Sequence, residues 1–134
     1  MELKLETFNK QSKNHNDFIM EWVEKRKFNF HPDCGSEFGM MAFDGTRPIA
    51  SIYFYHILAA KFVLLGFPIG NPDATKEERQ SALDFLVAEA EKKAKLLNYK
   101  FVVSYPGNKA SGSIFTRNNY QVADEGVVQY IKTL

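Results

Sequence analysis

The sequence predicts an α/β fold in which helices flank a central twisted sheet that mixes parallel and antiparallel strands. The main signal lies in residues 62–105, where a short apolar run, a long amphipathic run and a β-branched run follow one another. That order is typical of a parallel β-α-β unit, whose crossover is almost always right-handed. Asp44-Gly45 between two apolar runs is a second signal, because it predicts a tight hairpin. With 134 residues, we expect a single domain over residues 1–134.

Composition and charge argue against several classes of partner. The chain is 45% hydrophobic and 25% charged, as in ordinary globular proteins, and its net charge is +1. Such a balance offers no excess of Lys and Arg, so neither nucleic acid nor a membrane is expected as a partner. Cys34 is the only cysteine, so we expect no disulfide framework and no metal site. The first ten residues lack the apolar core of a signal peptide, which favours a cytoplasmic location.

The chain begins with a predicted strand and a predicted helix. Alternating leucines indicate the strand over residues 2–9. The helix is expected to begin at Asn14 or Asn16 as its N-cap. Its apolar stripe consists of Phe18, Ile19, Trp22 and Val23, and Arg26 continues the same spacing. Residues 31–35 then read as a loop, since they contain a proline and a glycine.

Residues 37–43 and 48–57 form the predicted hairpin. The second of these strands alternates between two largely apolar faces, which predicts a central position in the sheet. One face carries Ile52, Phe54 and His56, and the other carries Tyr53, Tyr55 and Ile57. A third consecutive strand follows over residues 62–67. Gly66 lies near its end, where a glycine often marks a bulge or a close approach of another group.

The long helix is predicted over residues 75–97 and has a clear start. Thr75 as N-cap and Glu78 at the third helical position form a capping box. An apolar stripe along this helix predicts that it packs on the sheet. Asn98 is expected to end the helix in the left-handed conformation, before a strand over residues 100–105.

The C-terminal part predicts a short helix and further strands. The helix covers residues 109–117 and ends at Asn118-Asn119. One or two strands are expected over residues 121–133. The sheet would therefore contain six to seven strands.

The loop of residues 66–76 is the predicted site of ligand binding. In a parallel β-α-β unit, ligands bind where the first strand ends and the helix begins. The backbone N–H groups at the start of a helix have no partner within it and can bind an anion.

This order of elements resembles the GNAT superfamily of N-acyltransferases over almost the whole chain. The resemblance rests on the loop and helix of residues 66–97 and on the asparagine-helix-aromatic segment of residues 108–120. It implies a three-layer fold and acetyl-CoA or another acyl-CoA as the cofactor. The pantetheine arm would lie along the strand that contains Leu65, Gly66 and Phe67, and backbone N–H groups before the long helix would hold the pyrophosphate.

The family's pyrophosphate motif, Arg/Gln-x-x-Gly-x-Gly/Ala, falls on residues 78–83, where neither glycine is present. An alternative is a shifted loop, in which Gly66, Gly70 and Asn71 supply the close backbone approach. The helix would then begin nearer Thr75.

Charges at the start of the long helix bear on the same site. Asp73, Glu77 and Glu78 would compete with a phosphate for the positive end of the helix dipole. Lys76 and Arg79 would offset part of this competition, and Arg79 is a candidate cofactor-binding residue.

The segment of residues 108–120 keeps the register of the family's second motif. Asn108 matches the residue that contacts the pantetheine. Phe115 stands where many members of the family have the tyrosine that protonates the departing thiolate. A phenylalanine has no hydroxyl group and cannot donate that proton.

Tyr53, Tyr55 and His56 are the candidate catalytic residues, because each carries a group that can donate or accept a proton. Each also has a purely structural interpretation. Aromatic residues on strands usually pack in a core or on a surface, and a hydrogen-bonded core histidine is more common than a catalytic one.

Two functions stay open at the level of the sequence. The first is an acyl-CoA-dependent N-acyltransferase that acts on a small-molecule or peptide amine, with a homodimer as an additional expected state. The second is a catalytically inactive GNAT-like domain that binds a ligand or a protein. The order of elements and Asn108 favour the first, whereas the missing glycines and Phe115 favour the second.

Overall fold

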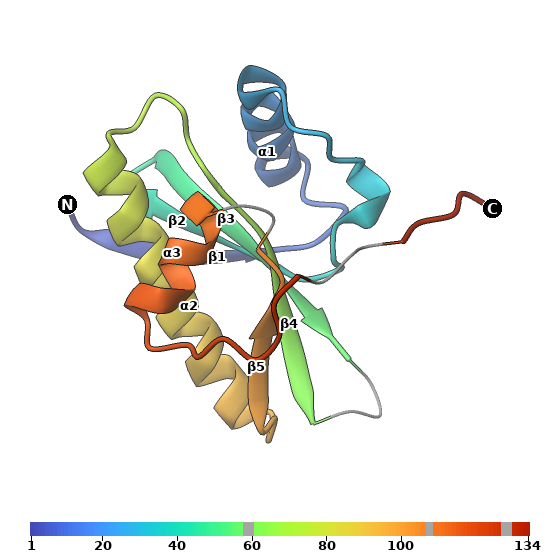
Figure 1. Cartoon of the computed structure of the whole chain (residues 1–134). Helices are drawn as coiled ribbons and strands as arrows, with labels where there is room; N and C mark the ends of the chain where they lie inside the picture. Colours follow the sequence, from blue (N-terminus) through green and yellow to red (C-terminus); the bar gives the residue numbers. More distant parts are fainter. Residues whose placement is uncertain (58–60, 107–108, 127–129) are drawn as a thin grey trace.

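The computed structural model describes residues 1–57, 61–106, 109–126 and 130–134, which form a five-stranded mixed sheet with helices on both faces (Figure 1). The strands lie in the order β1-β2-β3-β4-β5. The elements in chain order are β1 (Leu3–Phe8), α1 (Lys13–Arg26), the 3₁₀ helix η1 (Pro32–Cys34), β2 (Gly39–Asp44), β3 (Arg47–His56), β4 (Phe62–Gly70), α2 (Lys76–Leu96), β5 (Phe101–Ser104) and α3 (Lys109–Arg117).

The sheet consists of an antiparallel meander followed by one parallel crossover. Strands β1 to β4 pair antiparallel in sequence order, and β3 is central, as the sequence predicted. Helix α2 connects β4 to its parallel neighbour β5. This pairing ends at Leu65 and Ser104, whereas β4 continues to Gly70. The last part of β4 therefore has a partner strand on one side only.

A β-bulge bends β4 just beyond the end of β5. Between the pairs Ser51–Ile69 and Tyr53–Gly66, β4 contains one residue more than β3. Phe67 lies within this bulge with a φ of 47°, the left-handed region that side chains other than glycine rarely adopt. The irregularity that the sequence predicted at Gly66 is present here. Strand β4 extends beyond the predicted end at residue 67 because it continues to pair with β3 as far as Gly70.

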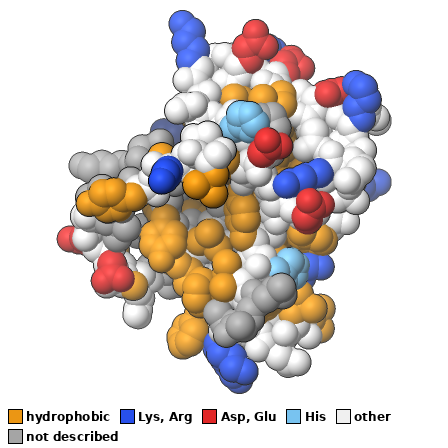
Figure 2. Space-filling view, turned by 90° about the vertical axis from the view of Figure 1, so that its right-hand side faces the viewer, with side chains coloured by type: hydrophobic (Ala, Val, Ile, Leu, Met, Phe, Trp, Pro, Cys, Tyr) orange, Lys and Arg blue, Asp and Glu red, His pale blue; other side chains and the backbone are white. Residues whose placement is uncertain are grey.

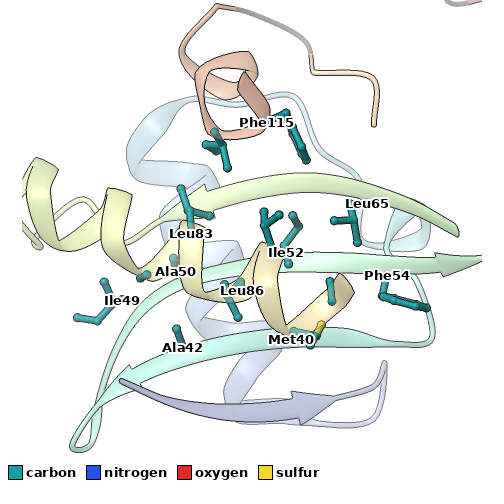
Figure 3. Packing of buried hydrophobic residues seen from close by; sticks show 14 of the residues in the cluster. Met40, Ala42, Ile49, Ala50, Ile52, Phe54, Leu65, Leu83, Leu86 and Phe115 are labelled. Carbon is teal, nitrogen blue, oxygen red and sulfur yellow. The ribbon is translucent and has the colours of Figure 1, made fainter. Parts of the chain in front are cut away.

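Three layers result from the helix positions, as expected. Helices α2 and α3 cover one face of the sheet, and α1 covers the other (Figure 1). On the α2 face, Leu83 and Leu86 from the helix pack on Ile52 and Phe54 of β3, with Phe115 of α3 beside them (Figure 3). On the α1 face, the buried cluster comprises Phe8, Ile19, Trp22, Val23, Met41, Phe43, Tyr53 and Ile69. Both faces of β3 are thus buried in apolar side chains.

The predicted signals at the helix ends are largely confirmed. Thr75 caps α2, and its side chain accepts the N–H of Glu78 while the Glu78 carboxylate accepts the N–H of Thr75. Asn98 follows this helix in the left-handed region with a φ of 64°, and Asn119 after α3 has a φ of 68°. The N-cap of α1 is Ser12, and not Asn14 or Asn16. The side-chain amide of Asn16 instead donates hydrogen bonds to the carbonyls of the turn before the helix.

The predicted sheet of six to seven strands is wrong, because the sheet has five strands. No strand occurs in residues 121–126 or 130–134, the described parts of the C-terminal segment. Val122 and Tyr130 there are 74% and 91% exposed. An alternating apolar pattern forms a strand only when it pairs with a sheet edge and packs against an apolar surface. The exposed residues described here do neither.

Candidate functional site

A groove opens at the point where β4 continues past the end of β5. It encloses about 360 Å³ between the C-terminal end of α1, the end of β4, the first turns of α2, and α3. Its floor contains Pro68, Ile69 and Gly70 of β4 and Leu83 of α2. The sequence predicted a site in this loop and helix start, and the groove lies there.

Basic side chains from three helices line this groove. They are Arg26 of α1, Lys76 and Arg79 of α2, and Arg117 of α3, and no acidic residue is among the lining residues described. Arg117 is paired with Asp84, 2.8 Å away. In the described part of the chain, Arg26, Lys76 and Arg79 pair with no carboxylate. The groove therefore has an uncompensated positive charge.

Arg26 and Arg79 lie close enough to affect each other. Burial lowers the pKa of Arg26, and the positive charge of Arg79 lowers it further. The two guanidinium groups are held by backbone carbonyls, since Arg26 Nε donates to the Gly70 oxygen at 2.9 Å and Arg79 Nη1 donates to the Ala74 oxygen. A bound anion would relieve the repulsion between them.

Gly70 is required for this arrangement because it leaves room for the stem of Arg79. A Cβ atom at Gly70 would lie 2.5 Å from Arg79 Cδ. Gly70 and Arg79 are therefore the two predicted cofactor-binding residues that the structure brings together in the groove.

The acidic residues at the start of α2 do not line the groove. Asp73 forms an ion pair with Lys25 at 3.3 Å. The Glu78 carboxylate receives the Thr75 N–H and pairs with Arg47, and these two contacts lower its pKa in that order. The competition with phosphate that the sequence suggested is thus reduced by the direction of these side chains.

The other predicted cofactor-binding residues that the structure describes are not among those that line the groove. Leu65 is fully buried, and Gly66 lies under the ring of Tyr55, whose Cε2 would be 2.7 Å from an added Cβ. Phe67 stacks on Phe30 with a ring-centroid distance of 4.0 Å.

Asn71 and Phe115 have structural contacts. The Asn71 side chain donates to the Pro48 carbonyl and its N–H donates to the Ile49 carbonyl, so Asn71 ties the end of β4 to β3. Phe115 is buried in the core (Figure 3). Its ring packs edge-on against Tyr120, at 5.1 Å between centroids. Asn108 lies outside the described residues.

The three candidate catalytic residues lie on different faces of the sheet. Tyr53 lines a second cavity of about 200 Å³ on the α1 face, and burial raises its pKa to about 12. Tyr55 donates its hydroxyl proton to the Cys34 carbonyl at 2.8 Å, and burial raises its pKa to about 12 as well. His56 is exposed on the opposite face, 3.1 Å from the Tyr99 hydroxyl.

Sequence reasoning missed Arg26 and Arg117 as groove residues. Arg26 is separated from Gly70 by 44 positions along the chain, and only the packing of α1 on the sheet brings them together. A signal was present, because a basic residue on the apolar stripe of a helix must reach a polar site beyond the core.

The described residues contain neither a cluster suited to a metal ion nor a helix suited to crossing a membrane. No group of three or more His, Cys, Asp or Glu side chains in this part of the chain is arranged to hold a metal ion. Among the helices that the structure describes, none has the length and apolar character needed to cross a membrane.

Comparison with known proteins identifies the fold. No family profile and no curated protein matches the sequence. Among solved structures, an aminoglycoside acetyltransferase from an uncultured soil metagenomic sample, in complex with trehalose, has a TM-score of 0.70 at 13% identity, over 98% of this chain and 96% of that one. The aminoglycoside N-acetyltransferase AAC(6')-Iy, in complex with the bisubstrate analogue CoA-S-monomethyl-acetylneamine, has a TM-score of 0.68 at 15% identity, over 100% of both chains.

A GNAT family acetyltransferase of Staphylococcus aureus also matches, with a TM-score of 0.62 at 14% identity, over 98% of this chain and all of that one. At such identities a structural match demonstrates a common fold. The meander, the bulged β4, the parallel crossover and the three layers of this chain therefore constitute the GNAT fold.

Proposed function

We propose that this protein is an N-acyltransferase that takes an acyl group from acyl-CoA in the basic groove and transfers it to an amine. The observation that carries the proposal is the uncompensated positive charge of Arg26, Lys76 and Arg79 at the end of β4. CoA bears a pyrophosphate and a further phosphate on its ribose. Arginine guanidinium groups bind phosphates with paired, charge-assisted hydrogen bonds, so the groove matches the most highly charged part of this cofactor.

The free edge of β4 supports the proposal at the other end of the cofactor. Beyond Leu65 and Ser104, β5 no longer pairs with β4. An extended chain such as the pantetheine arm can bind along such an edge through backbone hydrogen bonds. Phe67 and Pro68 lie in the bulge, and because proline has no N–H, the Phe67 N–H is the backbone donor that the bulge offers to the oxygen of a thioester.

The reaction requires few catalytic groups once both substrates are held in place. The amine nitrogen attacks the thioester carbonyl carbon, a C–N bond forms and the C–S bond breaks. The nitrogen loses one proton and the departing thiolate gains one. Orientation and oxyanion donors supply most of the acceleration in such a reaction. Tyr53, whose pKa of about 12 keeps the hydroxyl protonated at neutral pH, is the candidate for relaying the proton.

The acceptor in this proposal is a small-molecule or peptide amine. Two of the matched structures are aminoglycoside acetyltransferases, which supports an amine as the acceptor class. Because acyl-CoA is formed inside cells, the proposal also places the protein in the cytoplasm.

Titration calorimetry with CoA tests the proposal directly. Replacing Arg26 or Arg79 by Gln should weaken binding about tenfold or more, because each variant removes a charged hydrogen bond to phosphate. Arg47→Gln is the matched control, since Arg47 pairs with Asp44 and Glu78 and does not line the groove. An absence of CoA binding, or equal losses in all three variants, would contradict the proposal.

The alternative is a GNAT-like domain that binds a ligand without catalysis. The core packing of Phe115 favours it, because the position used by many members for a thiolate donor carries no hydroxyl group here. Release of free thiol from acetyl-CoA, measured with a panel of amines, separates the two functions. CoA binding without turnover on any amine would favour the binding domain.

A further inference from the structure

A second cavity lies on the α1 face of the sheet, directly behind the bulge of β4. It encloses about 200 Å³ and is lined by residues of α1, by the segment after α1 and by Tyr53 of β3. Phe28 lines the basic groove, whereas Phe30 lines this cavity. The Phe67 ring contacts both of them, at centroid distances of 6.2 Å and 4.0 Å. Phe67 therefore contacts one lining residue of the groove and one lining residue of the cavity.

Tyr53 brings a hydroxyl group to this cavity. Only 4% of the surface of this residue is exposed. Its hydroxyl makes no hydrogen bond with any residue that the structure describes. Ser51 Oγ is the only fully buried side-chain oxygen or nitrogen without a partner among these residues, so the Tyr53 hydroxyl still reaches accessible space. A hydroxyl that opens into a cavity in this way can form a hydrogen bond with a ligand bound there.

One part of the cavity wall is apolar, beside the polar lining residues Lys10, Asn16 and Asp33. Ile19 is 1% exposed, and Met20 and the Phe30 ring form further parts of the wall. Phe30 stacks on Tyr53 with an angle of 20° between the rings, at 5.9 Å. Such a wall binds a flat or aliphatic group by removing apolar surface from water.

The charged residues of the cavity lining balance each other. Lys10 and Asp33 are the two charged residues among those described there, one of each sign. Lys10 lies 3.5 Å from Glu37, and Asp33 lies 3.5 Å from His31. A polycation would need a surplus of carboxylates, which this lining does not provide.

We propose that this cavity binds the acyl acceptor, and that it selects a small primary amine carried on a single apolar or aromatic arm. The arm lies against Ile19, Met20 and Phe30, and the amine nitrogen is hydrogen-bonded to the Tyr53 hydroxyl. The inference rests on the proposed acyl transfer. The volume sets the size, since 200 Å³ is below the range of about 300–1,000 Å³ that is typical of sites for larger ligands.

The test measures binding of 2-phenylethylamine by ligand-observed NMR and calorimetry, both without and with saturating CoA. The expected dissociation constant rises about three- to tenfold in Tyr53→Phe, because one hydrogen bond is lost while the ring stays in place. Met20→Trp fills the cavity without removing the hydroxyl and should abolish binding. Tyr120→Phe is the matched control, since its hydroxyl meets Glu91, 3.3 Å away, and does not line this cavity. Thermal melts verify that each variant folds.

Selectivity and cofactor binding provide the remaining readouts. A bulky polycationic aminoglycoside such as sisomicin should bind more weakly than 2-phenylethylamine, and CoA affinity should be the same in Tyr53→Phe and the parent chain. The inference is overturned if 2-phenylethylamine fails to bind in both conditions, if Tyr53→Phe binds it as well as the parent, or if the aminoglycoside binds more tightly. Amine binding with the expected variant pattern but without any CoA binding would reject acyl transfer and support the cavity as an amine site.

Discussion

At the scale of single residues, Phe67 connects the fold to the site. A residue other than glycine in the left-handed region costs about 1–2 kcal/mol. Here the backbone at φ 47° aims the ring at Phe30 and Phe28, so aromatic packing offsets part of that cost. The same ring contacts Phe28, which lines the groove, and Phe30, which lines the second cavity.

Two substitutions of Phe67 separate the packing from the backbone conformation. Both Phe67→Ala and Phe67→Gly lose the ring contacts, but only glycine adopts φ 47° without strain. We expect Phe67→Ala to be less stable than Phe67→Gly by about 1 kcal/mol, although alanine is normally the better residue in a strand. Urea denaturation measures the difference, and an alanine variant as stable as the glycine variant would show that the bulge relaxes.

The second prediction concerns Phe115. From the sequence, a tyrosine at this position would restore the family's proton donor. The ring is 6% exposed, packs on Tyr120 and is not among the groove residues. Phe115→Tyr should therefore lower the free energy of unfolding by about 1–3 kcal/mol, because it buries a hydroxyl group without a partner. A faster release of thiol from acetyl-CoA without loss of stability would contradict this and restore the interpretation drawn from the sequence.

At the scale of elements, α2 combines structural stability with a role in the site. Its capping box joins Thr75 to Glu78, and Glu78 also pairs with Arg47 of β3. The residue after Glu78 is Arg79, which lines the groove. The cap thus fixes the position at which the helix begins, and the beginning of the helix sets where its basic side chains lie.

The loss of stability should depend on pH differently for the two residues of the capping box, Thr75 and Glu78. Thr75→Ala should cost about 1 kcal/mol at all pH values, whereas Ser81→Ala on the exposed side of the same helix should cost little. Folding lowers the pKa of the Glu78 carboxyl group. Its contribution to the stability of the folded state is therefore fully present above its pKa in the unfolded chain, and it is lost as the pH falls through its pKa in the folded chain. The difference in melting temperature between the parent and Glu78→Gln should therefore be largest near neutral pH and vanish in acid. A constant difference down to about pH 2 would refute it.

Local signals explain which elements the sequence predicted well. The capping box, Asn98 and Asn119 depend on contacts within a few positions, and the structure confirms all three. The five-residue continuation of β4 past Leu65 depends on pairing with β3, which no local pattern shows. For the groove, the sequence predicted the loop of residues 66–76 but not the full set of basic side chains. These come from three helices, and only tertiary packing brings them together.

At the scale of the whole molecule, apolar side chains are distributed unevenly over the surface. On the face drawn in Figure 2, they gather near the middle, with charged side chains around them. In the described part of the chain, β5 is an edge strand, and its Phe101 is 67% exposed. Exposed apolar edges of this kind favour association with another chain.

We therefore expect two copies of the chain to form a homodimer through this edge. Light scattering coupled to gel filtration should show a mass that rises with protein concentration. Phe101→Glu should shift the equilibrium to the monomer, because it places a charge on the apolar edge. Glu at Lys100, which is exposed beside it, is the control for the charge itself. A monomer at all concentrations would reject the dimer.

Charge is also unevenly distributed, although the net charge is only +1. Four basic side chains surround the groove, so the local field there is positive while the chain as a whole is nearly neutral. We expect CoA affinity to fall about tenfold between about 50 mM and about 500 mM NaCl, because the screening length shortens from more than 10 Å to a few Å. Acetyl-pantetheine lacks the phosphates of CoA and is the matched control ligand. Its affinity should be weaker and should change little over the same range of salt concentration. Calorimetry with both ligands measures this difference. Equal salt dependence would place the phosphates away from Arg26 and Arg79, whereas a steep dependence for CoA alone, lost in Arg26→Gln, would tie the charge of the groove to the cofactor.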